Sequence, residues 1–344
     1  MYKLIPLSLV LLNLNLILAG HKHQKNESEK KIEGKEISSL FRRSVTCQFP
    51  TDKGLVAVQT SGKNAGWAMH DDQECTAGSW CPYACPPGQL MGQWDPSVTS
   101  YTYPGSQYGG LYCDENGDLQ EERSGSYCYS GCGTVQVQNN LGQNSLWCQT
   151  VLPGNEEMLI PTNVVSGGKS TIAVPDQNYW AGTASHFYIN PPGVSVDDGC
   201  KWGSTANDYG NWAPYVAGAN QDSNKNTFVK IGWNPVYLED TSPFKSKEPS
   251  FGLRITCDDE SKCNGLPCEI DPSKTGVNGV SGSSSTGAGG GDFCVVTASD
   301  GATANIVVFD VSGSSTKKKR EQHEHAQHKR EVTRTVYTTV TKKV

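Results

Sequence analysis

The chain has 344 residues, of which 29 are Lys or Arg, 35 are Asp or Glu and 13 are Cys. Residues 44–316 contain 12 Lys and Arg against 28 Asp and Glu, a formal charge of −16. Such a chain would repel nucleic acid and anionic lipid surfaces, so we expect neither as a partner. A neutral polysaccharide is a more compatible partner.

The N-terminus is typical of a secretory signal. Tyr2-Lys3 precedes an apolar run over 4–18, and small residues follow it, so a signal peptide is predicted over 1–20. The run is too short for a bilayer span, which needs ~20 apolar residues, and it includes Asn13 and Asn15. We therefore expect a secreted, extracellular protein with no membrane association after signal removal.

Charged segments flank the presumed mature domain. Residues 21–43 are polar and end in Arg42-Arg43, which predicts a propeptide with a dibasic cleavage site; the alternative is an N-terminal arm that stays attached. Residues 312–344 form a basic, Thr-rich tail. The histidines of this tail are more typical of a solvated segment than of a metal site.

All thirteen cysteines lie between Cys47 and Cys294, and in a secreted chain they favour disulfides. The odd count leaves one cysteine free or able to form an intermolecular disulfide. Zinc ligation is the alternative for the short pairs Cys81/Cys85 and Cys128/Cys132. Only two histidines fall within 44–311, so we expect no metal. Because phosphate-binding and hydrolase motifs are also absent, we expect no cofactor.

The domain over 44–311 is predicted to be an all-β, disulfide-rich β-sandwich with a Cys/Trp-rich loop lobe over 45–150. Residues 276–291, rich in Gly and Ser, are expected to form a flexible loop. A thaumatin-like arrangement would suit this composition by analogy. The expected strands, rich in Val, Ile, Phe and Thr, are Thr171–Val174, His186–Ile189, Thr227–Trp233, Gly252–Cys257, Phe293–Thr297 and Asn305–Val311.

Aromatic residues are concentrated in the same domain, where all eight tryptophans lie. Flat rings stack on the C–H face of a sugar, and rings on loops with Pro and Gly tend to stay exposed. The alternative is that about half of the tryptophans pack against disulfides as core. The disulfide framework expected to hold the rings is Cys75, Cys81, Cys85 and Cys113. The candidate sugar-binding residues are Trp80, Tyr83, Trp94, Tyr108, Tyr112, Trp202 and Trp212.

Glycoside hydrolysis usually needs two carboxyl groups, one as acid and one as nucleophile or base. Asp95 and Asp208 are the first candidates, because aromatic neighbours can desolvate a carboxyl group and raise its pKa. Asp114 and Glu115 are further candidates, since they follow Cys113 and a disulfide could hold them rigid. Each acid has a plain alternative as a turn former or a solvated surface group.

Several separated sequence blocks resemble the SUN family of fungal cell-wall proteins, over about 47–311. The resemblance implies a secreted protein of the wall and septum, classed with β-glucosidases and acting on β-1,3-glucan. It assigns no catalytic residue. The blocks are the Cys75/Cys81/Cys85 spacing, Gln93–Pro96, Tyr108–Cys113, Ile231–Pro235, Phe251–Cys257 and Ala304–Phe309.

Two functions fit these features. One is a secreted glycosidase of wall β-1,3-glucan, with wall remodelling, morphogenesis and cell separation as its processes. The other is a non-catalytic β-glucan-binding wall protein, in which the same rings bind and the acids only solubilise. Hydrolysis requires two facing carboxyl groups in the aromatic groove, whereas binding does not. The chain departs from many family members because only a short charged segment, and no long Ser/Thr-rich region, precedes the cysteines.

Overall fold

The computed structural model describes residues 45–97, 109–120, 125–152 and 155–311, apart from the side chains of 151–159. The expected signal peptide, propeptide and tail lie outside these residues, and so does Tyr108. Within the described ranges, no helix is long and apolar enough to cross a membrane.

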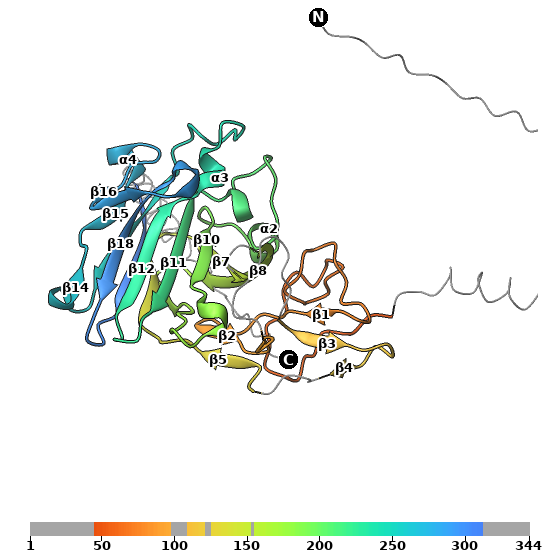
Figure 1. Ribbon diagram of the computed structural model, residues 1–344. Coiled ribbons are helices and arrows are strands. Elements are labelled where there is room, and N and C mark those ends of the chain that lie inside the picture. Colours follow the sequence, from red (N-terminus) through yellow and green to blue (C-terminus); the bar gives the residue numbers. More distant parts are fainter. Residues whose placement is uncertain (1–44, 98–108, 121–124, 153–154, 312–344) are drawn as a thin grey trace, which may run out of the picture. The chain divides into compact units, whose positions relative to one another are not determined.

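Two large sheets contain most of the strand residues of the described chain (Figure 1). The first has eight strands in the order β14-β18-β12-β11-β10-β7-β8, with β17 also paired to β18. Its pairs are antiparallel. The strands are β7 (Ser145–Leu152), β8 (Asn155–Val164), β10 (Ser185–Ile189), β11 (Tyr215–Gln221), β12 (Thr227–Trp233), β14 (Cys263–Asn264), β17 (Ser284–Thr286) and β18 (Asp292–Ala298).

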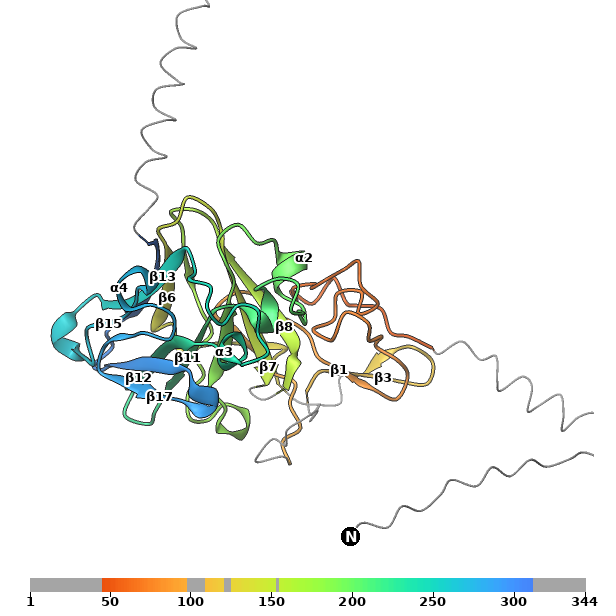
Figure 2. The same cartoon turned by 90° about the horizontal axis from the view of Figure 1, so that it is seen from above.

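The second sheet has six strands in the order β16-β15-β13-β19-β6-β9. Only its β19–β6 pair is parallel among the pairs described. Figure 2 shows β6, β13 and β15 in one layer and β11, β12 and β17 in the other. The strands are β6 (Val135–Asn139), β9 (Lys169–Thr171), β13 (Phe251–Cys257), β15 (Cys268–Ile270), β16 (Ser281–Gly282) and β19 (Ala304–Asp310).

The described residues of 45–97, 109–120 and 125–130 form a separate cluster that we call the Cys-rich lobe. It holds a three-stranded sheet and a two-stranded sheet. Their strands are β1 (Trp80–Cys81), β3 (Leu111–Cys113) and β4 (Leu119–Gln120), then β2 (Gln89–Met91) and β5 (Cys128–Ser130). Single turns complete the fold: α2 (Val196–Gly199), α3 (Pro235–Leu238), α4 (Pro272–Thr275), η1 (Trp180–Gly182), η2 (Gly210–Trp212), η3 (Glu260–Lys262) and η4 (Ala288–Gly290).

The main core lies between the two large sheets and follows from alternation along the strands. In β12, Val229 and Ile231 are fully buried, whereas Phe228 and Lys230 on the other face are half-buried. A disulfide between Cys268 of β15 and Cys294 of β18 joins the sheets. The expected all-β, disulfide-rich sandwich is therefore confirmed.

Twelve cysteines form six disulfides, and Cys132 keeps a free thiol. The zinc alternative is wrong for Cys81, Cys85 and Cys128, because their sulfurs are bonded to other cysteines. The pairs are Cys47–Cys113, Cys75–Cys81, Cys85–Cys128, Cys148–Cys200, Cys257–Cys263 and Cys268–Cys294.

Two expectations about the chain's organisation are wrong. The loop lobe does not reach residue 150, because β6 and β7 already belong to the sandwich sheets. The stretch 276–291 is not simply a loop, since β16 pairs with β15 and β17 pairs with β18. Backbone hydrogen bonds in these two short strands do not depend on an apolar side-chain pattern, and Gly and Ser therefore conceal them.

Candidate functional site

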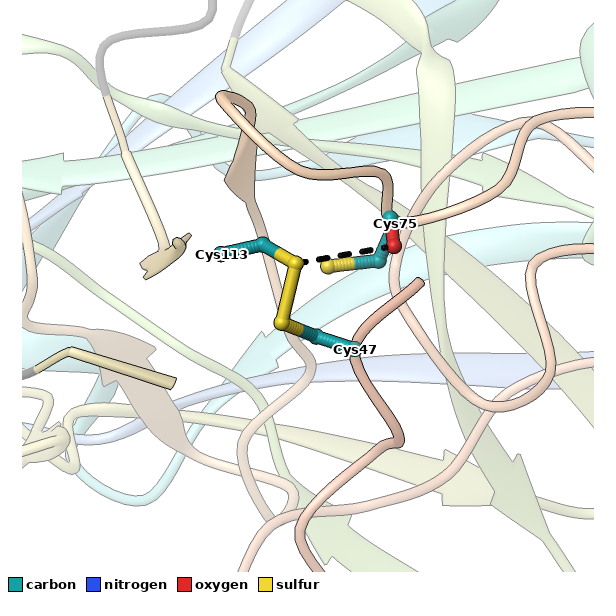
Figure 3. Close-up of side chains that lie close together, drawn as sticks. All are labelled: Cys47, Cys75 and Cys113. Atoms are coloured by element: carbon teal, nitrogen blue, oxygen red, sulfur yellow. Dashed lines mark hydrogen bonds between the residues drawn. A yellow bond between two sulfur atoms is a disulfide. The ribbon is translucent and has the colours of Figure 1, made fainter. Parts of the chain in front are cut away.

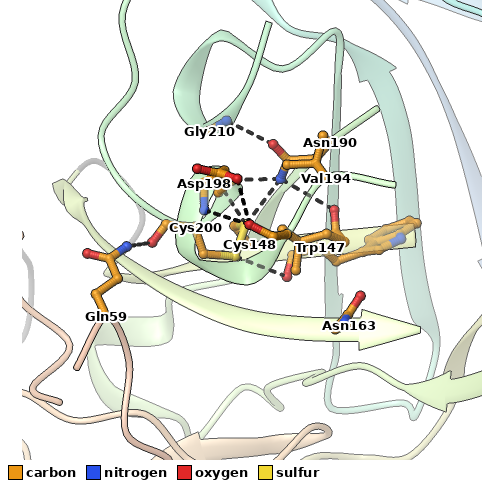
Figure 4. Close-up of a disulfide and its surroundings, with 12 residues drawn as sticks. Gln59, Trp147, Cys148, Asn163, Asn190, Val194, Asp198, Cys200 and Gly210 are labelled. Atoms are coloured by element: carbon orange, nitrogen blue, oxygen red, sulfur yellow. Dashed lines mark hydrogen bonds between the residues drawn. A yellow bond between two sulfur atoms is a disulfide. The ribbon is translucent and has the colours of Figure 1, made fainter. Parts of the chain in front are cut away.

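Residues 200–212 form a surface loop anchored at both ends (Figure 4). The Cys148–Cys200 disulfide ties its start to β7. Asn190, at the end of β10, accepts a hydrogen bond from the Gly210 backbone amide through Oδ1 at 2.9 Å. Gly210 has φ +58°, and a Cβ there would lie 2.3 Å from the Lys201 carbonyl oxygen. Only glycine fits this turn without displacing the loop.

Two more side chains fasten the same loop. Asn211 Oδ1 accepts a hydrogen bond from the Gly203 amide at 2.8 Å. Asn234 Nδ2 donates to the carbonyl oxygens of Asn211 and Ala213, each at 2.7 Å. From the Cys-rich lobe, Gln59 Nε2 donates to the Cys200 carbonyl oxygen (Figure 4). The backbone of the loop is thus held from four separate segments.

Trp202 is the most exposed tryptophan of the chain, with 38% of its surface accessible. Trp212, at the other end of the loop, is half-buried and packs edge-on against Phe244 with the ring centroids 6.3 Å apart. The two rings therefore differ in role. Trp202 is partly accessible to solvent on an anchored backbone, and Trp212 belongs partly to the core.

Asp208 lies in this loop and is 8% exposed. Its Oδ2 is 2.8 Å from the Lys247 ammonium. The neighbouring Tyr237 hydroxyl donates to the Lys247 carbonyl oxygen at 2.6 Å, and burial, aided by the Asp208 charge, raises the pKa of Tyr237. In the described structure, the ion pair between Asp208 and Lys247 fastens the loop to the segment that carries Lys247. The sequence could not reveal Lys247 as its partner, because 39 residues separate them.

Trp94 is only 7% exposed, so the expectation of an exposed ring is wrong. Its ring stacks on Trp180 of η1 with centroids 4.2 Å apart and planes 10° from parallel. Its indole N–H points to the Met91 carbonyl at 2.8 Å and to the Tyr179 hydroxyl oxygen at 2.9 Å. The ring therefore joins the Cys-rich lobe to the sandwich.

Asp95 follows this stack and is half-buried. Its Oδ1 accepts hydrogen bonds from the Ser97 amide at 2.9 Å and the Ser97 hydroxyl at 2.7 Å. Its carbonyl oxygen accepts from the Trp180 indole at 3.0 Å. The carboxylate caps a turn beside two tryptophans, and its contacts belong to different segments from those of Asp208.

Tyr83 is fully buried, so its expected exposure is also wrong. Its hydroxyl donates to the Tyr127 carbonyl at 2.7 Å, and burial raises its pKa. Cysteines and aromatic residues form the core of this small lobe, which leaves several of its rings no access to solvent.

Trp80 and Tyr112 form the aromatic pair of the small sheet. They are cross-strand neighbours on β1 and β3, with centroids 5.1 Å apart, and both are half-buried. The adjacent residues Cys81 and Cys113 are fully buried. Cys81 is bonded to Cys75 and Cys113 to Cys47, and the sulfurs of Cys47, Cys75 and Cys113 lie within 4.8 Å of one another (Figure 3). Two disulfides thus cross-link the strands that carry this aromatic pair, and the role of these cysteines in holding a sugar-binding surface stays a prediction.

Asp114 and Glu115 begin the turn between β3 and β4. The Asp114 carboxylate accepts hydrogen bonds from the amides of Asn116 and Asp118, and from Gln120 Nε2. The Asp118 amide is the main cause that lowers the Asp114 pKa from its ordinary value. Glu115 is exposed. Asp114 is therefore unsuited to serve as a protonated acid near neutral pH.

Two groups of side chains in the described ranges have metal-ligand geometry. Cys47, Cys75 and Cys113 are excluded, because all three sulfurs are in disulfides (Figure 3). His70 Nδ1 lies 2.8 Å from Asp72 Oδ1 and 3.2 Å from Asp71 Oδ1 on the surface. A histidine–carboxylate hydrogen bond accounts for this second arrangement.

The comparisons with known proteins agree over most of the chain. The family model described as Beta-glucosidase (SUN family) matches residues 42–296. The uncharacterized protein YMR244W of Saccharomyces cerevisiae is 65% identical over 87% of this chain and 86% of that protein. The probable secreted beta-glucosidase adg3 of Schizosaccharomyces pombe is 52% identical over 85% of this chain, but only 27% of that longer protein is covered. The probable secreted beta-glucosidase UTH1 of S. cerevisiae is 35% identical over 77% of this chain and 69% of that protein.

Among solved structures, the thaumatin-like xylanase inhibitor TLXI matches with a TM-score of 0.28 and 12% identity, over 51% of this chain and 97% of that one. A likeness at this level carries no argument. The thaumatin-like arrangement of the lobe and the sandwich therefore stays a prediction, whereas the all-β fold rests on the sheets themselves.

Proposed function

Because the chain belongs to the β-glucosidase (SUN) family, we propose that it is a secreted glycoside hydrolase acting on cell-wall β-1,3-glucan in wall remodelling, morphogenesis and septation. The family match and the relatives confirm the family resemblance predicted from the sequence. Support for hydrolysis and secretion comes from the relatives adg3 and UTH1, both named probable secreted beta-glucosidases.

The structural observation that carries the proposal is the exposed Trp202 on its anchored loop. A pyranose ring presents an apolar C–H face, and a flat indole can cover that face while sugar hydroxyls stay in contact with water. Because the loop backbone is already fixed, little conformational entropy would be lost on binding. A hydrolase needs such a subsite to hold the glucan chain in register.

The aromatic pair Trp80 and Tyr112 offers a second surface of the same kind. Both rings are half-buried, so part of each stays accessible, and the disulfides that cross-link their strands restrict rearrangement. The acidic composition supports a neutral polymer over an anionic one. We propose that this pair also contacts the glucan.

Asp95 and Asp208 remain the proposed catalytic carboxyl groups, with Asp95 ranked first. The stacked rings of Trp94 and Trp180 lie beside Asp95, whose backbone carbonyl accepts a hydrogen bond from the Trp180 indole. Asp208, which pairs with the Lys247 ammonium, is proposed as the nucleophile or base. Retaining hydrolysis needs two carboxyl groups ~5–5.5 Å apart, and inversion needs ~6.5–9.5 Å.

A non-catalytic β-glucan-binding role is the alternative, and one observation favours it. In the described structure, the Asp95 side chain accepts hydrogen bonds within a turn, and the Asp208 side chain forms an ion pair with Lys247. Both interactions are structural. Binding through Trp202 would then be the whole function.

The test is release of reducing ends from laminarin by the purified secreted protein, beside Asp95→Asn and Asp208→Asn. We expect turnover by the unmutated protein and a loss of ~100-fold or more when a catalytic carboxyl is replaced. Glucan pull-down without turnover by the unmutated protein would contradict hydrolysis and support the binding role.

A matched variant separates catalysis from anchoring at Asp208. Lys247→Met breaks the same ion pair but keeps the carboxyl group. If Asp208 only anchors the loop, the two variants should lower the melting temperature and the turnover alike. If Asp208 acts on the substrate, turnover in Asp208→Asn should fall much further than in Lys247→Met at a similar melting temperature.

A further inference from the structure

The outer face of the six-stranded sheet contains a cavity of about 420 Å³. This volume lies within the range of small-ligand sites, ~300–1,000 Å³. The cavity lies beside β13 and β15, on the side of the sheet away from the main core, because Leu253 and Ile255 are buried whereas Arg254 and Thr256 are half-buried. The residues that line the cavity include Arg254, Thr256, Glu260, Leu266, Pro267 and Glu269.

Covalent links hold the walls of this cavity. The Cys257–Cys263 disulfide closes the turn that carries Glu260, and Cys268–Cys294 fixes the start of β15 to the other sheet. Arg254 and Glu269 are directly opposite each other in the β13–β15 register. The polar groups are therefore pre-positioned on sheet strands, which favours specific binding over adaptable contact.

The charged pair at the centre of the cavity, Arg254 and Glu269, is not joined by a hydrogen bond. Arg254 Nη1 and Glu269 Oε2 are 3.9 Å apart, which is close enough for an ion pair but too long for a hydrogen bond. The Arg254 guanidinium is restrained by the Phe309 ring, 4.9 Å from its centroid, and Lys274 holds the other oxygen of Glu269 at 3.0 Å. A group that accepts from the guanidinium and donates to the carboxylate can bridge the two atoms from one side, at about 2.8 Å from each.

A hydroxyl group is the common group that donates and accepts at once. Glu260 adds an acceptor and makes the cavity lining net negative, which disfavours anionic ligands, and Leu266 and Pro267 add an apolar wall for C–H groups. We propose that this cavity binds a neutral oligosaccharide, through residues other than those of the 200–212 loop. The binding requires no hydrolysis and does not rest on the glycosidase activity.

The experiment maps binding on the full secreted protein by ¹⁵N NMR, with laminaripentaose, cellopentaose and mannopentaose as separate probes. We expect at least one of them to shift the amide resonances of Arg254, Thr256 and Glu269. Arg254→Gln and Glu260→Gln should each weaken that binding by roughly tenfold, about one lost charged hydrogen bond. A pentagalacturonate probe should bind roughly tenfold more weakly than the best neutral sugar, because of the net negative lining.

Glu248→Gln is the matched control, since it changes the same charge on an exposed residue that does not line the cavity. Glu260 is exposed on η3, so Glu260→Gln should keep the melting temperature even if Arg254→Gln lowers it. No shift with any of the three neutral probes would overturn the proposal, and so would unchanged affinity in Glu260→Gln. Laminarin turnover, followed separately, tests the hydrolase without affecting this outcome.

Discussion

The strands of the Cys-rich lobe are only two or three residues long, whereas those of the sandwich run up to ten. Three disulfides fall within residues 47–128 of the lobe, and its core consists largely of cysteines and aromatic rings. The sandwich also has three disulfides, but its core comes from alternating Val, Ile, Leu and Phe on long strands. In the lobe, disulfides therefore provide the stabilisation that long hydrogen-bonded strands provide in the sandwich.

This difference matters for sugar binding. A small region without long strands cannot bury enough apolar surface to fix loop positions, so cross-links supply the rigidity. The sandwich achieves the same at the 200–212 loop with one disulfide and several buried Asn side chains. Four experiments test how the lobe and the sandwich differ in stability and in glucan binding.

The largest effect is expected from removing the Cys47–Cys113 disulfide with the double variant C47A/C113A. The two cysteines are 66 residues apart, and loop-closure entropy predicts a loss of about 4 kcal/mol in lobe stability. Limited proteolysis should then cut the lobe first while the sandwich stays protected. If lobe and sandwich were cut at the same rate, the lobe would not be an independently cross-linked region.

Trp94→Ala should have the next largest effect, because it removes the stack on Trp180 that joins the two regions. Truncating a buried tryptophan is expected to cost about 3 kcal/mol. Calorimetry should resolve two transitions in place of one. Trp94→Phe, which keeps an aromatic ring, should retain most of the stability, and equal loss in both variants would rule out the stack as the cause.

Acid should weaken the sandwich through His186 of β10. Burial, with the Lys230 ammonium as a second cause, lowers the pKa of His186 to about 4. The unfolded chain, with a histidine pKa of ~6.5, therefore binds more protons between these values, and stability falls as the pH drops from ~6.5 to ~4. For this half-buried ring we expect a loss of about 2 kcal/mol.

Denaturant unfolding at several pH values checks this expectation. His186→Gln should remove most of the pH dependence in that window, and His70→Gln, at the other described histidine, should not. If stability depended on pH equally in both variants, His186 would not be the cause of the acid sensitivity.

The smallest effect on stability is expected from Trp202→Ala, about 0.5 kcal/mol, because Trp202 is the most exposed of the tryptophans. Its binding effect should be large by comparison, with glucan pull-down reduced about tenfold at an unchanged melting temperature. A matched Trp212→Ala should instead lower the melting temperature. Unchanged pull-down in Trp202→Ala would remove the loop from the glucan surface.

Much of the sandwich could be predicted from the sequence, because alternation is a local signal. The expected strand Thr227–Trp233 matches β12, and Gly252–Cys257 lies within β13. The expected Thr171–Val174 overlaps β9 only at Thr171. Strand β11 was missed, since Gly and Ala fill most of its centre and conceal the alternation.

The site was less predictable, because its character depends on contacts between distant residues. Trp94 and Trp202 both lie among loop-forming residues, and only packing distinguishes the buried ring from the exposed one. The expectation that about half of the tryptophans are structural fits the four that are buried: Trp67, Trp94, Trp147 and Trp233. Whether Asp95 or Asp208 is catalytic stays a prediction.

No disulfide joins the Cys-rich lobe to the sandwich, which has a consequence for biosynthesis. A chain that oxidises as it emerges can complete the lobe's three pairs before Cys132 is made, so its six cysteines choose among 15 pairings rather than among those of all thirteen. Cys132 is the next thiol to appear after Cys128. Its side chain packs against the main core, which later strands complete, so the competing thiol stays available for mispairing until those strands have been synthesised.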